Sequence, residues 1–308
     1  YLAGRSMGFA VLFLTLYATQ YSGNTMFGYT GKSYRIGFEW TVSVLFMFSI
    51  ITGYLLFAPR LVAVARRFHF ITPGDYIRQR FGSSALTLLA TVLMIYALGN
   101  YTLAQLKAMG AAVEGITDGR IGSEYGIVAL AIIMVVYETL GGMRSVAWTD
   151  VIQGVVLLLG FGILLFLVPE LGGGLSRVVE QLSVQEPQMV TAPSLLTCNT
   201  WISFIVLLGC GAAIYPQAIQ RLYASKSVAG LKRSLAFMAF MPLTTTLIAL
   251  ICGATGRIVL PGIEGVETDQ VLARLCGLIM QDSVIGYWLV VIIIAAALAA
   301  LMSTADSA

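Results

Sequence analysis

Two apolar stretches of the sequence carry polar residues whose types and spacing suit a monovalent cation. The stretch near residues 7–30 contains the run ATQYSGNT, from Ala18 to Thr25. A polar, glycine-containing run inside a membrane span is tolerated where unwound backbone lines a cavity. We therefore expect a helix that breaks here and exposes the carbonyls of Ala18 and Tyr21. The alternative is close helix packing through Ser22 and Gly23.

The last apolar stretch places two hydroxyl groups on one helical face. Ala300, Ser303 and Thr304 are spaced i, i+3 and i+4, so they share that face. Sodium prefers oxygen ligands, and the carboxyl end of a half-helix favours a cation. The carbonyls of Ala18, Tyr21 and Ala300 with the two hydroxyls therefore predict a sodium site. The alternative is that both hydroxyls bond back to their own helix.

A second break is indicated near residues 209–217, which read GCGAAIYPQ. Glycine and proline weaken a helix and can break it. The break lies five predicted helices after the first one. That offset is typical of an inverted repeat that binds its substrate between the two breaks, although an ordinary proline kink is the alternative. Hydrogen-bonding side chains at the two breaks are candidates for binding a solute: Gln20, Asn24, Thr25, Tyr215 and Gln217.

One carboxylate, Asp150, stands near the start of a predicted apolar helix. An ionisable residue inside a membrane span indicates function. A structural interpretation remains beside it, in which Asp150 caps the helix or complements its dipole.

The elements that must position these residues are membrane helices. Hydrophobic residues make up 58% of the 308 residues and charged residues only 11%, whereas a soluble domain has about 25% charged residues. The net charge of +3 is too small to indicate nucleic acid binding. Apolar runs of the length that spans a bilayer predict an all-α, polytopic protein with eight helices, near 7–30, 38–66, 84–113, 124–143, 148–169, 199–222, 230–256 and 283–308.

Charged residues alternate in sign from one connection to the next. Acidic residues dominate the connections near 170–186 and 264–269. Two connections that alternate with these are basic, with Arg60, Arg66, Arg67, Arg78 and Arg80 in one and Arg221, Lys226, Lys232 and Arg233 in the other. The positive-inside rule therefore predicts a multi-pass protein of the cell membrane with its basic loops in the cytoplasm. A short interfacial helix is expected at 72–81, where Pro73 suits a first helical position.

The chain resembles the sodium:solute symporter family, which includes proline, pantothenate, sialic acid and sugar symporters. The resemblance covers the whole chain in order. It rests on YLAGRSMG at residues 1–8, ATQYSG at 18–23, Gly141-Gly142 before Trp148-Thr149-Asp150 and Gln153, Pro216-Gln217 with Arg221, and MSTADS at 302–307.

This resemblance implies a leucine-transporter-like inverted five-helix repeat, of which core helices 1 to 8 of ten are present. Residues 1–308 would form a single transporter domain truncated at both ends, with 1–169 as the first repeat and 199–308 as the first three helices of the second. The family's sodium site matches the five oxygens above. In members with a second sodium, an aspartate at the position of Asp150 joins helix 8 hydroxyls. Ser303 and Ser307 match these here, whereas Asp306 stands where such a member has a hydroxyl.

The implied function is sodium-coupled symport of a small organic solute, such as an organic acid or amino acid, by alternating access. Sodium would be the coupling ion, the bilayer the surrounding partner, and no other cofactor is expected. The alternative is a transporter-like sensor domain of a signalling protein. An enzyme is not expected, because the sequence has no HExxH motif and no convincing nucleophile–base pair.

Overall fold

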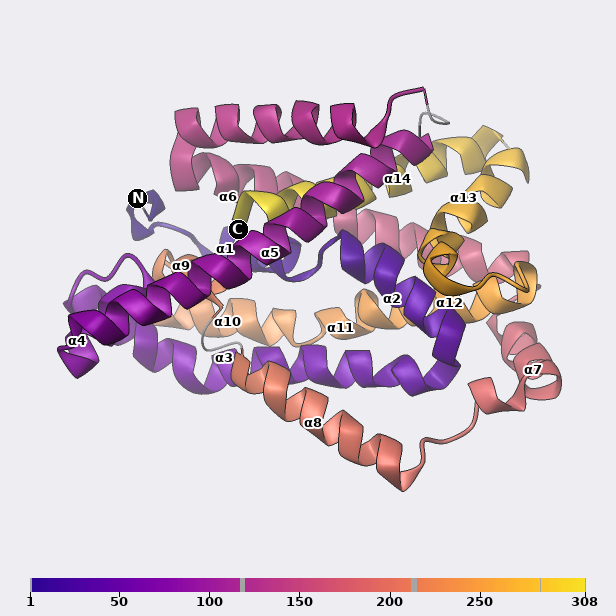
Figure 1. Ribbon diagram of the computed structural model, residues 1–308, viewed down its shortest axis with the longest axis horizontal. Coiled ribbons are helices and arrows are strands. Elements are labelled where there is room, and N and C mark those ends of the chain that lie inside the picture. Colours follow the sequence, from indigo (N-terminus) through magenta and orange to yellow (C-terminus); the bar gives the residue numbers. More distant parts are fainter. Residues whose placement is uncertain (1, 117–119, 212–214, 283, 308) are drawn as a thin grey trace.

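The computed structural model describes residues 2–116, 120–211, 215–282 and 284–307 as a bundle of helices (Figure 1), and no strand occurs in these ranges. The helices are α1 Phe9–Gln20, α2 Gly23–Ile36, α3 Val42–Arg67, α4 Pro73–Phe81, α5 Ser84–Ile116, α6 Ser123–Leu171, α7 Leu175–Gln185, α8 Leu195–Gly211, α9 Pro216–Tyr223, α10 Val228–Met238, α11 Met241–Thr244, α12 Thr246–Val259, α13 Val271–Asp282 and α14 Val284–Ser307.

The predicted first helix is broken, as expected from its sequence. Tyr21 and Ser22 have extended backbone conformations, with ψ angles of 101° and 176°. Helical hydrogen bonding ends where the Tyr21 amide donates to the Tyr17 carbonyl at 3.0 Å. The chain re-enters a helix at Gly23. The predicted break near 209–217 also separates two helices, α8 and α9, which are bent by 48° relative to each other.

The two predicted helices at 124–143 and 148–169 form the halves of α6, which reverses direction at Gly142 (Figure 1). Gly142 has a φ of 55°, a conformation that favours glycine. The expected loop between these helices is therefore reduced to a single kink. The predicted short helix at 72–81 is confirmed as α4, and the side chains of Thr72 and Asp75 cap its start.

The predicted continuous helix at 230–256 is wrong in one respect, because it is interrupted twice. It divides into α10, α11 and α12, with interruptions near Ala239 and at Thr245. Pro242 lies at the start of α11 and cannot donate an amide hydrogen to the preceding turn. α13 and the helical part of the long connection, α7, complete the bundle.

Long apolar helices make up most of the molecule. By length and apolar composition, five helices among the described residues could cross a membrane: Gly23–Arg67 (α2 with α3), Ser84–Lys107, Ser145–Leu171, Met241–Val259 and Val284–Thr304. The bent pair α8 and α9 would make a sixth. Two further predicted spans appear in part as the shorter apolar helices Phe9–Gln20 and Ser123–Val136.

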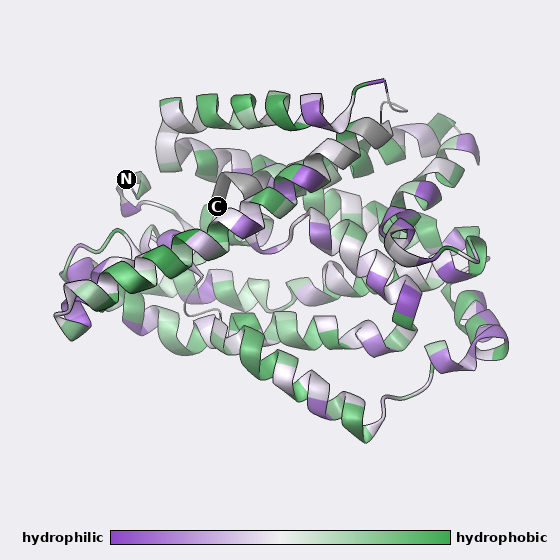
Figure 2. Ribbon diagram, in the orientation of Figure 1, coloured by the Kyte–Doolittle hydropathy of each residue, from purple (hydrophilic) through white to green (hydrophobic). Residues whose placement is uncertain are grey.

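Hydrophilic residues gather toward the two ends of the bundle, around α4 at one end and α7 at the other (Figure 2). The connections that carry basic residues, after α3 and after α9, lie at the end with α4, and so does the kink of α6 (Figure 1). Large apolar side chains such as Leu56 on α3, Leu88 on α5 and Phe166 on α6 are exposed. An apolar exposed surface of this kind suits a protein surrounded by lipid.

Candidate functional site

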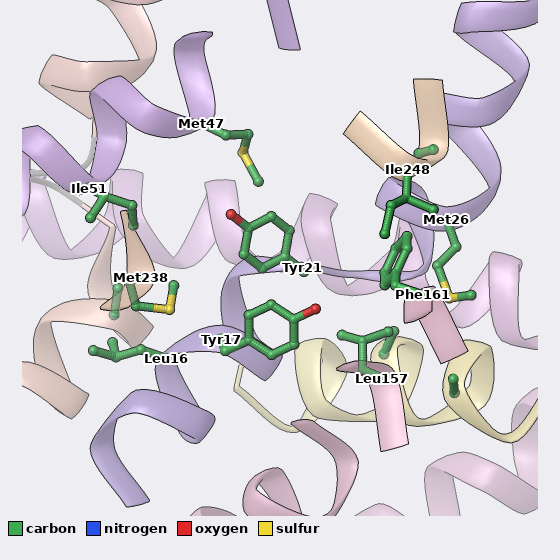
Figure 3. Packing of buried hydrophobic residues seen from close by; sticks show 14 of the residues in the cluster. Leu16, Tyr17, Tyr21, Met26, Met47, Ile51, Leu157, Phe161, Met238 and Ile248 are labelled. Atoms are coloured by element: carbon green, nitrogen blue, oxygen red, sulfur yellow. The ribbon is translucent and has the colours of Figure 1, made fainter. Parts of the chain in front are cut away.

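The break between α1 and α2 lies in the buried centre of the bundle. Ala18 and Tyr21 are fully buried. The rings of Tyr17 and Tyr21 lie side by side at the break, 4.9 Å apart, with Met47 near the Tyr21 hydroxyl (Figure 3). Because helical bonding ends at the Tyr17 carbonyl, the carbonyls of Ala18 and Tyr21 accept no helical hydrogen bond among the described residues. These groups are oriented by the end of a helix whose dipole favours a cation.

The hydroxyl face of α14 is buried as well. Ala300, Ser303 and Thr304 each have 1% or less of their surface exposed. Thr304 Oγ1 donates a hydrogen bond to the Ala300 carbonyl at 2.8 Å, which is the back-bonding that the alternative interpretation requires. This bond uses the hydroxyl hydrogen and leaves lone pairs on the hydroxyl oxygen. Back-bonding and cation binding are therefore compatible at Thr304.

The break and α14 lie against each other. α14 packs on both α1 and α2. A Cβ atom added to Gly23 would lie only 2.2 Å from Cδ2 of Leu301, so glycine permits this close approach. α5, which carries Tyr101, packs on both α2 and α14. The structure therefore brings the residues of the predicted sodium site into one buried region.

Tyr101 on α5 is a site residue that sequence reasoning did not identify. Its ring meets the ring of Tyr215 edge to face, with 6.3 Å between the ring centroids. Tyr101 therefore touches the second break from a helix that packs on α2 and α14. The sequence alone does not single out Tyr101 as a site residue. Tyr96 lies on the same apolar helix and is 71% exposed, so a tyrosine on this helix does not by itself indicate a buried site.

Tyr215 and Gln217 lie together at the second break. Gln217 Nε2 donates to the Tyr215 hydroxyl at 2.9 Å. Gln217 is buried, and its Oε1 has no hydrogen-bond partner among the described residues. A cavity of about 880 Å3 lies between α3, α4, α5 and α9, lined mostly by apolar side chains, with Tyr101 and Tyr215 in its wall. These residues offer hydrogen bonds at the edge of an apolar space.

The other solute candidates occupy different surroundings. Gln20 is half-buried, and its amide lies 3.8 Å from the Met47 sulfur. Thr25 is buried in the first turn of α2, where its amide donates to the Ser22 carbonyl. Asn24 is exposed, so the structure does not bring it together with Tyr215 and Gln217. The side chain of Ser307 lies outside the described part of the structure.

Asp150 does not cap a helix, so that interpretation is wrong. It lies inside α6, past the kink at Gly142, and is fully buried. Its Oδ2 forms an ion pair with Nη2 of Arg221 at 2.7 Å and accepts a hydrogen bond from the Thr15 hydroxyl. Arg221 is only 1% exposed. Its expected place among the charges of a cytoplasmic loop is therefore also wrong.

Comparison with known proteins identifies the same class of molecule along the whole chain. The model of the sodium:solute symporter family matches residues 1–308. A solved structure of a Na+-coupled sialic acid symporter in a substrate-bound outward-open state superimposes with a TM-score of 0.82. That match covers 99% of this chain and 65% of the symporter at 20% identity. The leucine-transporter-like fold expected from the sequence is confirmed.

Two curated relatives are sodium/pantothenate symporters. The protein from Escherichia coli K12 is 29% identical over 85% of this chain, and the protein from Haemophilus influenzae is 26% identical over 100% of it. The chain spans 54% and 62% of their lengths. A sodium/glucose cotransporter of Vibrio parahaemolyticus is 28% identical over 84% of this chain and 49% of its own. The family and the apolar helices show a multi-pass membrane protein.

Proposed function

Because this chain belongs to the sodium:solute symporter family, we propose that it forms the ion- and solute-binding core of a sodium-coupled symporter. The observation that carries the proposal is the buried meeting of the α1–α2 break with the hydroxyl face of α14. The reported relatives are transporters, so the comparisons favour transport over a sensor domain.

Sodium binds through the carbonyls of Ala18, Tyr21 and Ala300 and the hydroxyls of Ser303 and Thr304. All five oxygens are uncharged, so the ion keeps its charge while its water shell is replaced by fixed dipoles. The end of α1 adds a favourable dipole. Because these ligands come from α1 and α14, sodium holds the two helices together and stabilises the conformation that receives solute from outside.

The solute binds between the two breaks, beside Tyr101, Tyr215 and Gln217. The buried Gln217 Oε1 lacks a partner among the described residues, and such a group costs free energy until a ligand satisfies it. The apolar cavity wall suits the hydrocarbon part of the solute. A small organic acid that joins polar groups to an apolar part fits both features, and pantothenate, named for two relatives, is the first to test.

Alternating access follows from the repeat. Residues 1–169 form the first five-helix repeat and residues 199–308 the first three helices of the second, within one transporter domain. Rocking of one group of helices against the other exposes the site first outside and then in the cytoplasm, where the basic loops lie. The sodium gradient supplies the direction, since one charge crossing 100 mV gains about 2.3 kcal/mol.

Thermal unfolding of the full-length protein in sodium and in potassium tests this function before the solute is known. A ligand that binds only the folded protein raises Tm, so sodium should raise Tm above its value in equal potassium. The solute that the protein transports, to be sought among pantothenate, a monocarboxylate and glucose, should raise Tm further. This rise should be larger in sodium than in potassium, because coupling is reciprocal. Equal Tm values in both salts at every solute would contradict the proposal.

A further inference from the structure

Asp150 lies at a buried point where three helices meet. Its carboxylate belongs to α6, Arg221 to α9 and Thr15 to α1, and all three side chains are buried. α1 and α9 are the half-helices that border the two breaks. Arg221 also donates from Nε to Thr15 Oγ1 at 2.9 Å. The guanidinium is thus held between the carboxylate and the half-helix that precedes the proposed sodium site.

The carboxylate of Asp150 is only half used. Both of its hydrogen bonds reach Oδ2, whereas Oδ1 is buried and has no hydrogen-bond partner among the described residues. An ionised carboxylate offers about four acceptor positions. A buried acceptor without a partner requires an explanation, and an oxygen on a carboxylate is the kind of ligand that a hard cation prefers.

A buried ion pair is weak evidence for stability, because removing two charges from water costs about as much as their attraction returns. Its retention in an apolar bundle therefore points to another role. Arg221 carries a fixed positive charge on α9, four residues after Gln217, and its Nη1 lies 3.3 Å from the Gln217 carbonyl. The position of the guanidinium is therefore tied to the half-helix that carries the candidate solute residues.

We propose that the guanidinium of Arg221 is a tethered cation that competes with sodium for the carboxylate of Asp150. While α9 lies against α1 and α6, the protein itself supplies the positive charge at this carboxylate. When α9 moves, the charge is withdrawn and a sodium ion takes its place at Asp150. This inference rests on the proposed sodium coupling, and it links a movement at the solute residues to the occupancy of a second cation position.

The test is the Tm of the full-length protein in sodium and in potassium at equal ionic strength. The variants are Arg221→Gln, Asp150→Asn and the two combined. Arg221→Gln leaves the carboxylate without its cation, so sodium should restore stability that potassium does not. The sodium-induced rise in Tm should be at least about twofold larger than in the parent. The combined variant should lose this additional rise, because it has no carboxylate left to bind sodium.

Two controls separate competition from simple loss of an ion pair. Arg221→Lys keeps the positive charge, so it should show no additional sodium response. Arg257→Gln breaks the pair with Glu186, whose two bonds measure 2.7 and 2.9 Å, and should lower Tm equally in both salts.

The inference is overturned if Arg221→Gln loses equal stability in sodium and potassium, or cannot be recovered folded in either salt. If the parent still responds to sodium in that case, the proposed function stands and only the competition fails. If instead the parent shows no sodium response while Arg221→Gln does, the competition stands and the proposed coupling through the α1–α14 site fails.

Discussion

At the scale of single residues, the proposed site combines uncharged oxygens for the ion with a separate buried charge pair. Backbone carbonyls and hydroxyls surround the break, whereas Asp150 and Arg221 neutralise each other beside it. This division suits a carrier that must release its ion in every cycle. Neutral dipoles bind a monovalent ion more weakly than a full charge would, and the carboxylate is already partnered.

Tyr101 provides a test of the link between ion and solute. Its ring contacts Tyr215 at the second break and its helix packs on α14, so Tyr101→Phe removes the hydroxyl at this junction while keeping the ring. The loss of one hydrogen bond costs about 1 kcal/mol, so solute affinity should fall by about fivefold. Solute titrations followed by Tm measure the effect. Tyr96→Phe, at an exposed position on the same helix, is the matched control, and an equal loss there would contradict the assignment.

Sequence reasoning identified the residues at the break but misread some of their neighbours. The run from Ala18 to Thr25 is polar inside an apolar stretch, and that contrast carries the signal. Arg221 was assigned to a loop because a basic residue near the end of a span usually lies outside the membrane. Its partner, Asp150, is 71 residues away, and only tertiary packing places the two together.

At the scale of helices, breaks follow from packing as much as from sequence. Pro59 and Pro169 lie inside α3 and α6 without ending them, whereas the helix interrupted at α11 contains Pro242. Proline alone therefore does not predict an interruption, and this explains the error over residues 230–256. The break after Gln20 was predictable because polar residues accompany its glycine.

The packing of α2 on α12 depends on a glycine that sequence reasoning did not single out. A Cβ atom on Gly253 would lie 2.4 Å from the Thr30 carbonyl oxygen, a backbone atom that cannot move alone. Gly253→Ala should therefore destabilise the protein by about 1–3 kcal/mol despite the better helix propensity of alanine. The measurement is the denaturant midpoint. Gly99→Ala on α5, where nothing lies within 4 Å, should be neutral or stabilising; equal losses in both would refute the packing argument.

At the scale of the whole molecule, the ends of the bundle differ in charge. Basic residues follow α3 and α9 at one end, while the connection that contains α7 carries Glu180 and Glu186 at the other (Figures 1 and 2). The sequence predicted this alternation well, because loop charge depends on composition and not on packing. The side of the membrane at which each end lies stays a prediction.

Cysteine labelling tests that orientation. In a background without the four native cysteines, single cysteines at residues 60–80 and 223–232 should react only from the cytoplasmic side. Those at 172–192 should react only from outside, because basic loops are retained in the cytoplasm. A membrane-impermeant maleimide applied to intact cells and to inverted vesicles gives the comparison. Labelling of a cysteine at position 66 in intact cells would show that the orientation is the opposite of the predicted one.

Sodium is proposed to bind between the α1–α2 break and α14, and a sodium titration of Ser303→Ala and Thr304→Ala in the full-length protein tests this binding most directly. Each change removes one of about five oxygens, and hard-ion sites depend on ligand number and geometry. Thr255→Ala, which removes a fully buried hydroxyl on α12, is the matched control. We predict that both α14 variants need at least about tenfold more sodium for half-maximal stabilisation, equivalent to about 1.4 kcal/mol, while Thr255→Ala follows the parent. Unchanged sodium curves in both α14 variants would contradict the account.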